Sequence, residues 1–178
     1  MTRFFKEFTY YFITSPTLRH QKLFDTDFKK DIILNRIIDG SKKFGLKDLY
    51  FGINSHHYHL LAYFGKFTTV PKLLNYVNGG SSFELNNLDN ARGRMVWDEY
   101  HLYLIEDDNA LYQIKGYIIG NPYKHGEVET IKKLKDYKYS SFSNVVRQAG
   151  ESQAEDMVLS CINLNLADFK KGLKLLYN

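Results

Sequence analysis

The histidines at positions 57 and 59 are the residues of this sequence best placed to bind a metal ion. They flank Tyr58 in a mostly apolar run that reaches Phe64. Successive side chains of a β-strand point to opposite faces, so residues two apart share a face and lie about 7 Å apart along the strand. His57 and His59 would therefore hold two imidazoles side by side, which is half of a metal site.

A second pair of chemically useful residues occurs further along the chain. Tyr117 and Asn121 are four positions apart in a segment compatible with a helix, and this spacing places them on one helix face. The phenol could act as a nucleophile and the amide oxygen as a metal ligand. Both the His-x-His and the Tyr-x-x-x-Asn spacings arise easily by chance, so the surrounding sequence must decide what they mean.

The composition is that of one globular domain spanning 1–178. The 178 residues are 44% hydrophobic and 25% charged, which permits a core without disulfides or structural metals. The net charge of +4 suits a polyanionic partner without requiring one. Aromatic residues make up 16% of the chain, and tyrosine can stack on unpaired bases.

The single cysteine, Cys161, excludes an internal disulfide and any cysteine-based zinc site. It lies in an apolar stretch, and we expect it in the core. Charged residues interrupt every short apolar run near the N-terminus, which is not typical of a signal peptide. No stretch approaches the length of a membrane span. We therefore expect a cytoplasmic protein with no membrane partner.

The order of predicted elements indicates an α+β protein. We expect a central antiparallel sheet with helices packed mainly on one face, as in a ferredoxin-like fold. Thr26 or Asp25 is expected to cap the first helix. Asn121-Pro122 should end the helix that carries Tyr117, because proline disfavours helical geometry in the residue before it. The predicted strands cover 8–14, 46–54, 56–64 and 95–105, and the predicted helices cover 26–43, 71–77, about 108–120 and 167–177, with a largely helical tail over 143–178.

This order of segments resembles the single-tyrosine transposases of the HUH superfamily, particularly the REP-associated tyrosine transposases. The resemblance covers about residues 8–142. Two positions depart from the family pattern: Ser55-His56 stands where Pro-Asn is usual, and Tyr58 replaces an aliphatic residue. The matching segments are Arg19 to Leu23-Phe24, His57-Tyr58-His59, Ser81 to Leu85-Asn86, Val96-Trp97 to Tyr100-His101, and Tyr117-Ile118 to Asn121-Pro122, closed by Tyr137 to Ser140-Ser141-Phe142.

The resemblance implies a metal-dependent endonuclease and strand transferase acting on single-stranded DNA that contains a hairpin. Tyr117 would be the nucleophile and would form a 5′-phosphotyrosine link. His57, His59 and Asn121 would bind Mg²⁺ or Mn²⁺. Some relatives are homodimers that exchange the tyrosine helix, whereas others act as monomers, and the sequence leaves this open.

The residues expected to contact DNA are basic. They are Arg92, Arg94, Lys124, Lys132 and Lys133.

Two other functions fit parts of the same pattern. The chain could be a non-catalytic nucleic-acid-binding module on a ferredoxin-like sheet, with Tyr10 and Tyr11 as base-stacking platforms. It could also be a metal hydrolase that uses water as its nucleophile. A denaturation-resistant protein–DNA adduct would distinguish the transposase from both.

Overall fold

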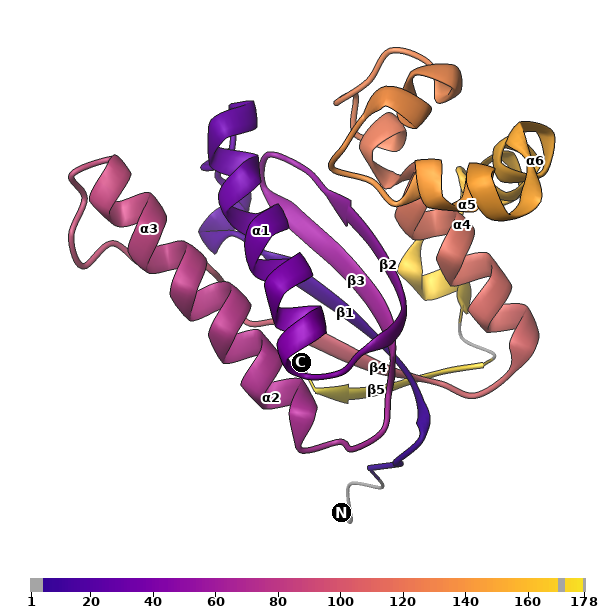
Figure 1. Cartoon of the computed structure of the whole chain (residues 1–178), viewed down its shortest axis with the longest axis horizontal. Coiled ribbons are helices and arrows are strands. Elements are labelled where there is room, and N and C mark those ends of the chain that lie inside the picture. Colours follow the sequence, from indigo (N-terminus) through magenta and orange to yellow (C-terminus); the bar gives the residue numbers. More distant parts are fainter. Residues whose placement is uncertain (1–4, 170–171, 178) are drawn as a thin grey trace.

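The computed structural model describes residues 5–169 and 172–177. Helices and strands are distributed along the chain much as expected, and Figure 1 shows their arrangement. The strands are β1 (Thr9–Pro16), β2 (Lys47–Ile53), β3 (His57–Phe64), β4 (His101–Ile105) and β5 (Leu173–Tyr177). The helices are α1 (Asp27–Lys43), α2 (Thr69–Leu74), α3 (Gly80–Leu88), α4 (Asp108–Lys124), α5 (Phe142–Ala149) and α6 (Glu151–Cys161).

The five strands form one sheet in the order β2-β3-β1-β4-β5, and every neighbouring pair is antiparallel. The α+β class and the antiparallel sheet are therefore confirmed. The strand β1 lies at the centre, and its Thr14 is opposite His59 on one side and His101 on the other. This register places three polar residues in one row across the sheet.

Helices cover both faces of the sheet, which corrects the expectation that they would lie mainly on one (Figure 1). On one face, Ile13 and Leu60 pack in a core with Ile33 of α1. On the other face, Phe12 and Leu61 pack in a core with α4. Both faces are apolar because β1 and β3 are nearly continuous hydrophobic runs, a pattern typical of strands covered on two sides.

The helix α4 continues through Asn121-Pro122, where the sequence predicted its end. Proline has no N–H to donate to the carbonyl of Ile118, so this carbonyl lacks the hydrogen bond that a regular helix would provide. It points at Gly52 of β2, where an added Cβ would lie only 2.3 Å from the oxygen. The next carbonyl, of Ile119, accepts a hydrogen bond from Ser140 Oγ at 2.9 Å. The tertiary structure thus accommodates the proline inside the helix.

Leu173–Tyr177 forms the edge strand β5 rather than part of the helix predicted over 167–177, of which residues 170 and 171 lie outside the described part of the chain. The tail is helical earlier, in α5 and α6. Pairing satisfies backbone groups that would otherwise be exposed along β4. Leu173 packs in the α4-side core and Leu176 in the α1-side core, as the two-residue alternation of a strand requires.

Two other boundaries differ from the predictions. The helix predicted over 71–77 continues through a π-helical turn (Asn75–Gly79) into α3, so that Gly79 and Gly80 are both helical. Gly80 leaves room for the Arg36 guanidinium, which would contact an added Cβ at 2.6 Å. The strand predicted over 95–105 is regular only from His101 onward, and Trp97 makes an isolated bridge with Thr17.

None of the helices within the described residues combines the length and apolar character needed to cross a membrane.

Candidate active site

His57 and His59 share the face of β3 that α4 covers, as their spacing predicted. Both are buried, with 6% and 2% of their surface exposed. Their ring centroids are 4.7 Å apart. The sheet therefore holds two imidazoles side by side against a rigid backbone.

His59 is oriented by its neighbour on the central strand. The Oγ1 atom of Thr14 lies 3.0 Å from His59 Nδ1, and the two residues face each other in the β1–β3 register. Because Nδ1 is occupied in this way, Nε2 is the ring nitrogen available for a ligand.

Asn121 meets His57 across the boundary between sheet and helix. The distance from its Oδ1 to His57 Nε2 is 2.8 Å, and the same oxygen accepts a 2.6 Å hydrogen bond from Asn54 Nδ2. Asn54 Nδ2 also lies 2.9 Å from His57 Nε2. All three side chains are buried. A hydrogen bond between Nε2 and Asn121 needs a proton on Nε2, whereas one from Asn54 needs Nε2 unprotonated, so both cannot form at once.

Tyr117 lies one helical turn before Asn121 and beside the histidine pair. Its ring centroid is 5.2 Å from that of His59, and the ring also packs edge-on against Phe169. Burial raises the pKa of the Tyr117 phenol, and the nearby Asn121 side chain partly offsets this effect. The Lys124 ammonium lies 5.3 Å from the centre of the Tyr117 ring, close enough for a cation–π interaction.

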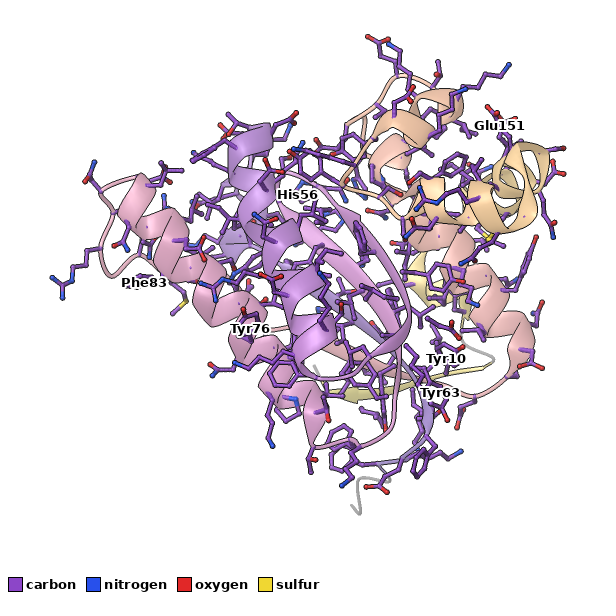
Figure 2. The ribbon with its side chains drawn as sticks, viewed as in Figure 1. Tyr10, His56, Tyr63, Tyr76, Phe83 and Glu151 are labelled. Carbon is purple, nitrogen blue, oxygen red and sulfur yellow. The ribbon has the colours of Figure 1, made fainter. Side chains whose placement is uncertain are left out.

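A cavity of about 600 Å³ opens beside these residues. Tyr117, Thr14 and all six histidines of the sequence line it. The histidines come from the turn after β1, from β3 and its preceding turn, from β4 and from the end of α4: they are His20, His56, His57, His59, His101 and His125. Figure 2 shows His56 where the β2–β3 turn approaches the first turn of α1.

The imidazoles nearest the sheet are neutral at physiological pH. Burial lowers the pKa of His57 to about 3 and holds that of His59 well below its ordinary value. Burial also lowers the pKa of His56 and of His125. A neutral imidazole is the form that ligates metals, so the cluster is electronically suited to a cation.

The residues present fit a divalent cation. Adjacent ligands of an octahedral Mg²⁺ ion lie about 3 Å apart, close to the 2.8 Å between His57 Nε2 and Asn121 Oδ1. Among the described residues, the buried Nδ2 atom of Asn121 has no hydrogen-bond partner, so they leave this amide partly unsatisfied. Over residues 5–169 and 172–177, no three His, Cys, Asp or Glu side chains form a group that could hold a metal ion. The candidate set depends on the amide oxygen as its third donor.

A buried ion pair fixes the turn that precedes His57. The Nζ atom of Lys30 on α1 donates to Glu127, just beyond the end of α4. The other carboxylate oxygen of Glu127 accepts a 2.7 Å hydrogen bond from the backbone N–H of Ser55. Lys30 is only 6% exposed. This network connects α1, the β2–β3 turn and the end of α4, the three segments that surround the histidine pair.

The predicted DNA contacts fall into two groups. Arg94 and Lys124 are engaged within the fold: Arg94 pairs with Asp89 at 2.8 Å, and Lys124 Nζ donates to the Leu164 carbonyl at 2.6 Å. Lys133 forms an exposed ion pair with Glu129.

Arg92 and Lys132 are exposed, with no side-chain hydrogen bond or ion pair among the described residues. The role of these basic residues in DNA contact stays a prediction.

Three residues of the site were not predicted from the sequence. His125 follows Asn121 by four positions, so the helical spacing that paired Tyr117 with Asn121 would also have found it. Asn54 directly precedes the turn before His57, and its amide character was the available signal. Thr14 had no local signal, because only the β1–β3 register brings it to His59.

No protein-family model matches this sequence, and no curated protein matches it. Solved structures do resemble the fold. One is a REP-associated tyrosine transposase bound to a REP hairpin, with a TM-score of 0.62 and 15% identity over 85% of this chain and 87% of the other. Another is a protein from Deinococcus radiodurans R1 named as a candidate transposase, with a TM-score of 0.44 and 19% identity over 66% of this chain and 92% of the other. The chain thus has the fold of a REP-associated tyrosine transposase.

Proposed function

We propose that this protein is a metal-dependent endonuclease and strand transferase for single-stranded DNA, and that it works through a covalent 5′-phosphotyrosine intermediate. The observation that carries the proposal is that His57, His59 and Tyr117 line one cavity. Asn121 lies directly behind them, with its Oδ1 atom 2.8 Å from His57 Nε2. The fold shared with a REP-associated tyrosine transposase supports it independently.

The proposed cofactor is Mg²⁺ or Mn²⁺, held by His57, His59 and the amide oxygen of Asn121. When bound, the cation would polarise the scissile phosphate and offset the negative charge that develops on it. Thr14 and Asn54 would orient the imidazoles and the amide toward it.

Tyr117 is the proposed nucleophile. Its hydroxyl oxygen would bond to phosphorus while the bond between phosphorus and the 3′ oxygen breaks, and the proton lost from the phenol would end on the 3′-hydroxyl. The phenol is protonated at neutral pH, and burial raises its pKa further above the ordinary value. The nearby Lys124 ammonium would favour the phenolate as it forms. The phosphotyrosine ester retains the energy of the original bond, so a 3′-hydroxyl could rejoin the strand without ATP.

The proposed substrate is DNA with a hairpin and an unpaired flank. The similar structure named above is a complex with a REP hairpin, and we extend that substrate class to this chain as part of the proposal. Tyr117 and His59 of the same chain are adjacent, which supports a site formed within one subunit.

The alternative of a non-catalytic module on strand aromatics has little support. Tyr11 is fully buried, and its hydroxyl donates to the Lys6 carbonyl at 2.6 Å. Tyr10 packs edge-on against Tyr63 and donates to Asp48. These rings are not available as stacking platforms.

The test is adduct formation. The full chain is incubated with a labelled hairpin oligonucleotide and Mn²⁺, and the products are separated under denaturing conditions. We expect a protein-linked band that requires Mn²⁺ and is lost in Tyr117→Phe. Tyr123→Phe, six residues further along α4, is the matched control and should retain the band. Cleavage without a protein-linked product would instead indicate a water nucleophile and overturn the proposal.

A further inference from the structure

Phe83 is an aromatic residue on α3 that the core leaves exposed. Its side chain is 67% exposed, and Figure 2 shows it on α3, across the sheet from α4. It lines a second cavity of about 340 Å³, together with Asn86, Asn87, Arg92 and Gly93. None of the residues that line this cavity lines the cavity of the candidate active site.

The loop that forms this cavity is held in one conformation by its own hydrogen bonds. The Asn86 side chain donates to the Arg94 carbonyl at 2.8 Å and accepts from Arg94 Nε at 3.0 Å. The backbone N–H of Ala91 donates to the Asn86 carbonyl at 2.8 Å. Arg94 also pairs with Asp89, to which Lys29 of α1 binds from the other side. A loop fixed in this way presents a preformed surface, which reduces the entropy lost on binding.

Three exposed side chains line this cavity and make no hydrogen bond or ion pair with other described residues. Phe83 offers an exposed ring, Arg92 an exposed guanidinium with no acidic partner, and Asn87 an exposed side-chain amide. Gly93 also lines the cavity, and the space beside its Cα is open, since an added Cβ would meet nothing within 4 Å. An aromatic ring and a guanidinium plane both stack on nucleobases, and an amide can pair with a base edge. The chemistry that this set recognises is therefore a flat heteroaromatic ring attached to a phosphate backbone.

The cavity is connected to the active site by a short piece of chain. The segment after Gly93 crosses the end of β1, where the Leu18 N–H donates to the Val96 carbonyl and the Asp98 N–H to the Pro16 carbonyl. Asp98 already lines the cavity that holds Tyr117. From Gly93 to Asp98 the backbone spans at most about 18 Å, so one flexible nucleic-acid strand could reach both cavities.

We infer that Phe83, Arg92 and Asn87 form a subsite for one unpaired nucleobase of single-stranded DNA, separate from the position of cleavage. This inference rests on the proposed function, because it takes the DNA substrate as given. It assigns to the exposed face of α3 the role of holding the substrate strand while another part of the strand occupies the active site.

The test measures binding and adduct formation separately. Binding of a dye-labelled hairpin oligonucleotide with a single-stranded flank is followed by fluorescence anisotropy in EDTA. Phe83→Ala should bind about tenfold more weakly than the native chain, the size expected for one lost base–aromatic stack. Phe28→Ala, which removes an equally exposed ring from α1, should bind normally. Thermal melting confirms that both variants are folded.

An abasic site moved along the flank locates the stacked base. At one position the abasic site should weaken binding to the native chain about tenfold and cause no further loss in Phe83→Ala. Native affinity in Phe83→Ala, or an equal loss on a blunt duplex without unpaired bases, would overturn the subsite. Adduct formation by the native chain would still stand in that case. Failure of the native chain to form an adduct would instead remove the proposed function.

Discussion

The Nε2 atom of His57 lies 2.8 Å from the Oδ1 atom of Asn121, and this contact joins β3 to α4. A neutral imidazole can account for this distance with its own Nε2–H, which then donates to the amide oxygen. Burial lowers the pKa of His57 to about 3, so the ring is neutral near pH 7, and in its other tautomer Nε2 is unprotonated and free to bind a metal. A divalent cation bound by both atoms would replace the shared proton at a similar spacing.

Removing the Asn54 side chain should weaken metal binding. Asn54 holds Asn121 through a 2.6 Å hydrogen bond, and a group that orients a metal ligand in this way typically contributes 10- to 100-fold to metal affinity. We expect Asn54→Ala to bind Mn²⁺ about 10- to 100-fold more weakly by isothermal titration calorimetry. Asn109→Ala, at an exposed position in the first turn of α4, should bind normally. Equal affinities in the two folded variants would count against the site.

Thr14→Val should slow adduct formation without unfolding the protein. Valine keeps the shape of threonine on the central strand but removes the oxygen that lies 3.0 Å from His59 Nδ1. We expect a slower rate of adduct formation in single-turnover assays and recovery in Thr14→Ser, which restores the hydroxyl. A Thr14→Ser variant as slow as Thr14→Val would show that packing, and not the hydrogen bond, is what matters.

Gly52→Ala should destabilise the fold at the point where α4 passes over β2. A Cβ at this position would lie 2.3 Å from the Ile118 carbonyl oxygen, so the helix that carries Tyr117 must move. We expect a loss of about 1–3 kcal/mol in the free energy of unfolding, measured with urea. Gly65→Ala is the control, because its nearest contact would be an ordinary 3.9 Å. Equal stability of both variants would contradict the close approach.

Glu127→Gln should leave the Lys30 ammonium buried without a counter-ion. We expect a loss of about 3 kcal/mol in the free energy of unfolding. Glu129→Gln breaks only an exposed ion pair with Lys133, and it should change stability little. Adding Lys30→Met to Glu127→Gln should recover part of the loss, which a purely steric effect of glutamine would not allow.

The same ion pair predicts a dependence of stability on pH. Burial acts to raise the pKa of Glu127, but the Lys30 ammonium and the Ser55 N–H outweigh it and leave the pKa below its ordinary value. A carboxylate with a lowered pKa in the folded state stabilises the fold above its unfolded pKa of about 4.3, and this contribution is lost as the pH falls through the folded pKa. The stability difference between native chain and Glu127→Gln should therefore be constant near neutrality and shrink in acid. A constant difference down to pH 2 would contradict the ion pair.

Local periodicity was enough to predict the faces of the site. The alternation of a strand placed His57 with His59, and the helical repeat placed Tyr117 with Asn121, and the structure has both arrangements. The meeting of the two faces depends on contacts distant in sequence. The contacts that accommodate Pro122 inside α4 involve Gly52 and Ser140, which are distant in sequence. A prediction from local sequence alone could therefore not show that the helix continues through the proline.

The incorrect helix prediction near the C-terminus and the failure to predict Thr14 as a site residue also arise from contacts that are distant in sequence. Leu173–Tyr177 has apolar residues that suit either a short helix or a strand, and the free edge of β4 decides between them. Thr14 belongs to the site only through the strand register. Sequence patterns therefore predicted which side chains share an element, whereas tertiary pairing decided which elements meet.

The most direct test of the account is to locate the DNA on the protein. The adduct formed with a hairpin oligonucleotide and Mn²⁺ is digested with trypsin and nuclease, and the modified peptide is sequenced by mass spectrometry. Cleavage after Lys115 and Lys124 gives a peptide that contains both Tyr117 and Tyr123. We expect a nucleotide on Tyr117 alone. A nucleotide on Tyr123 or on any other residue would contradict the proposed nucleophile.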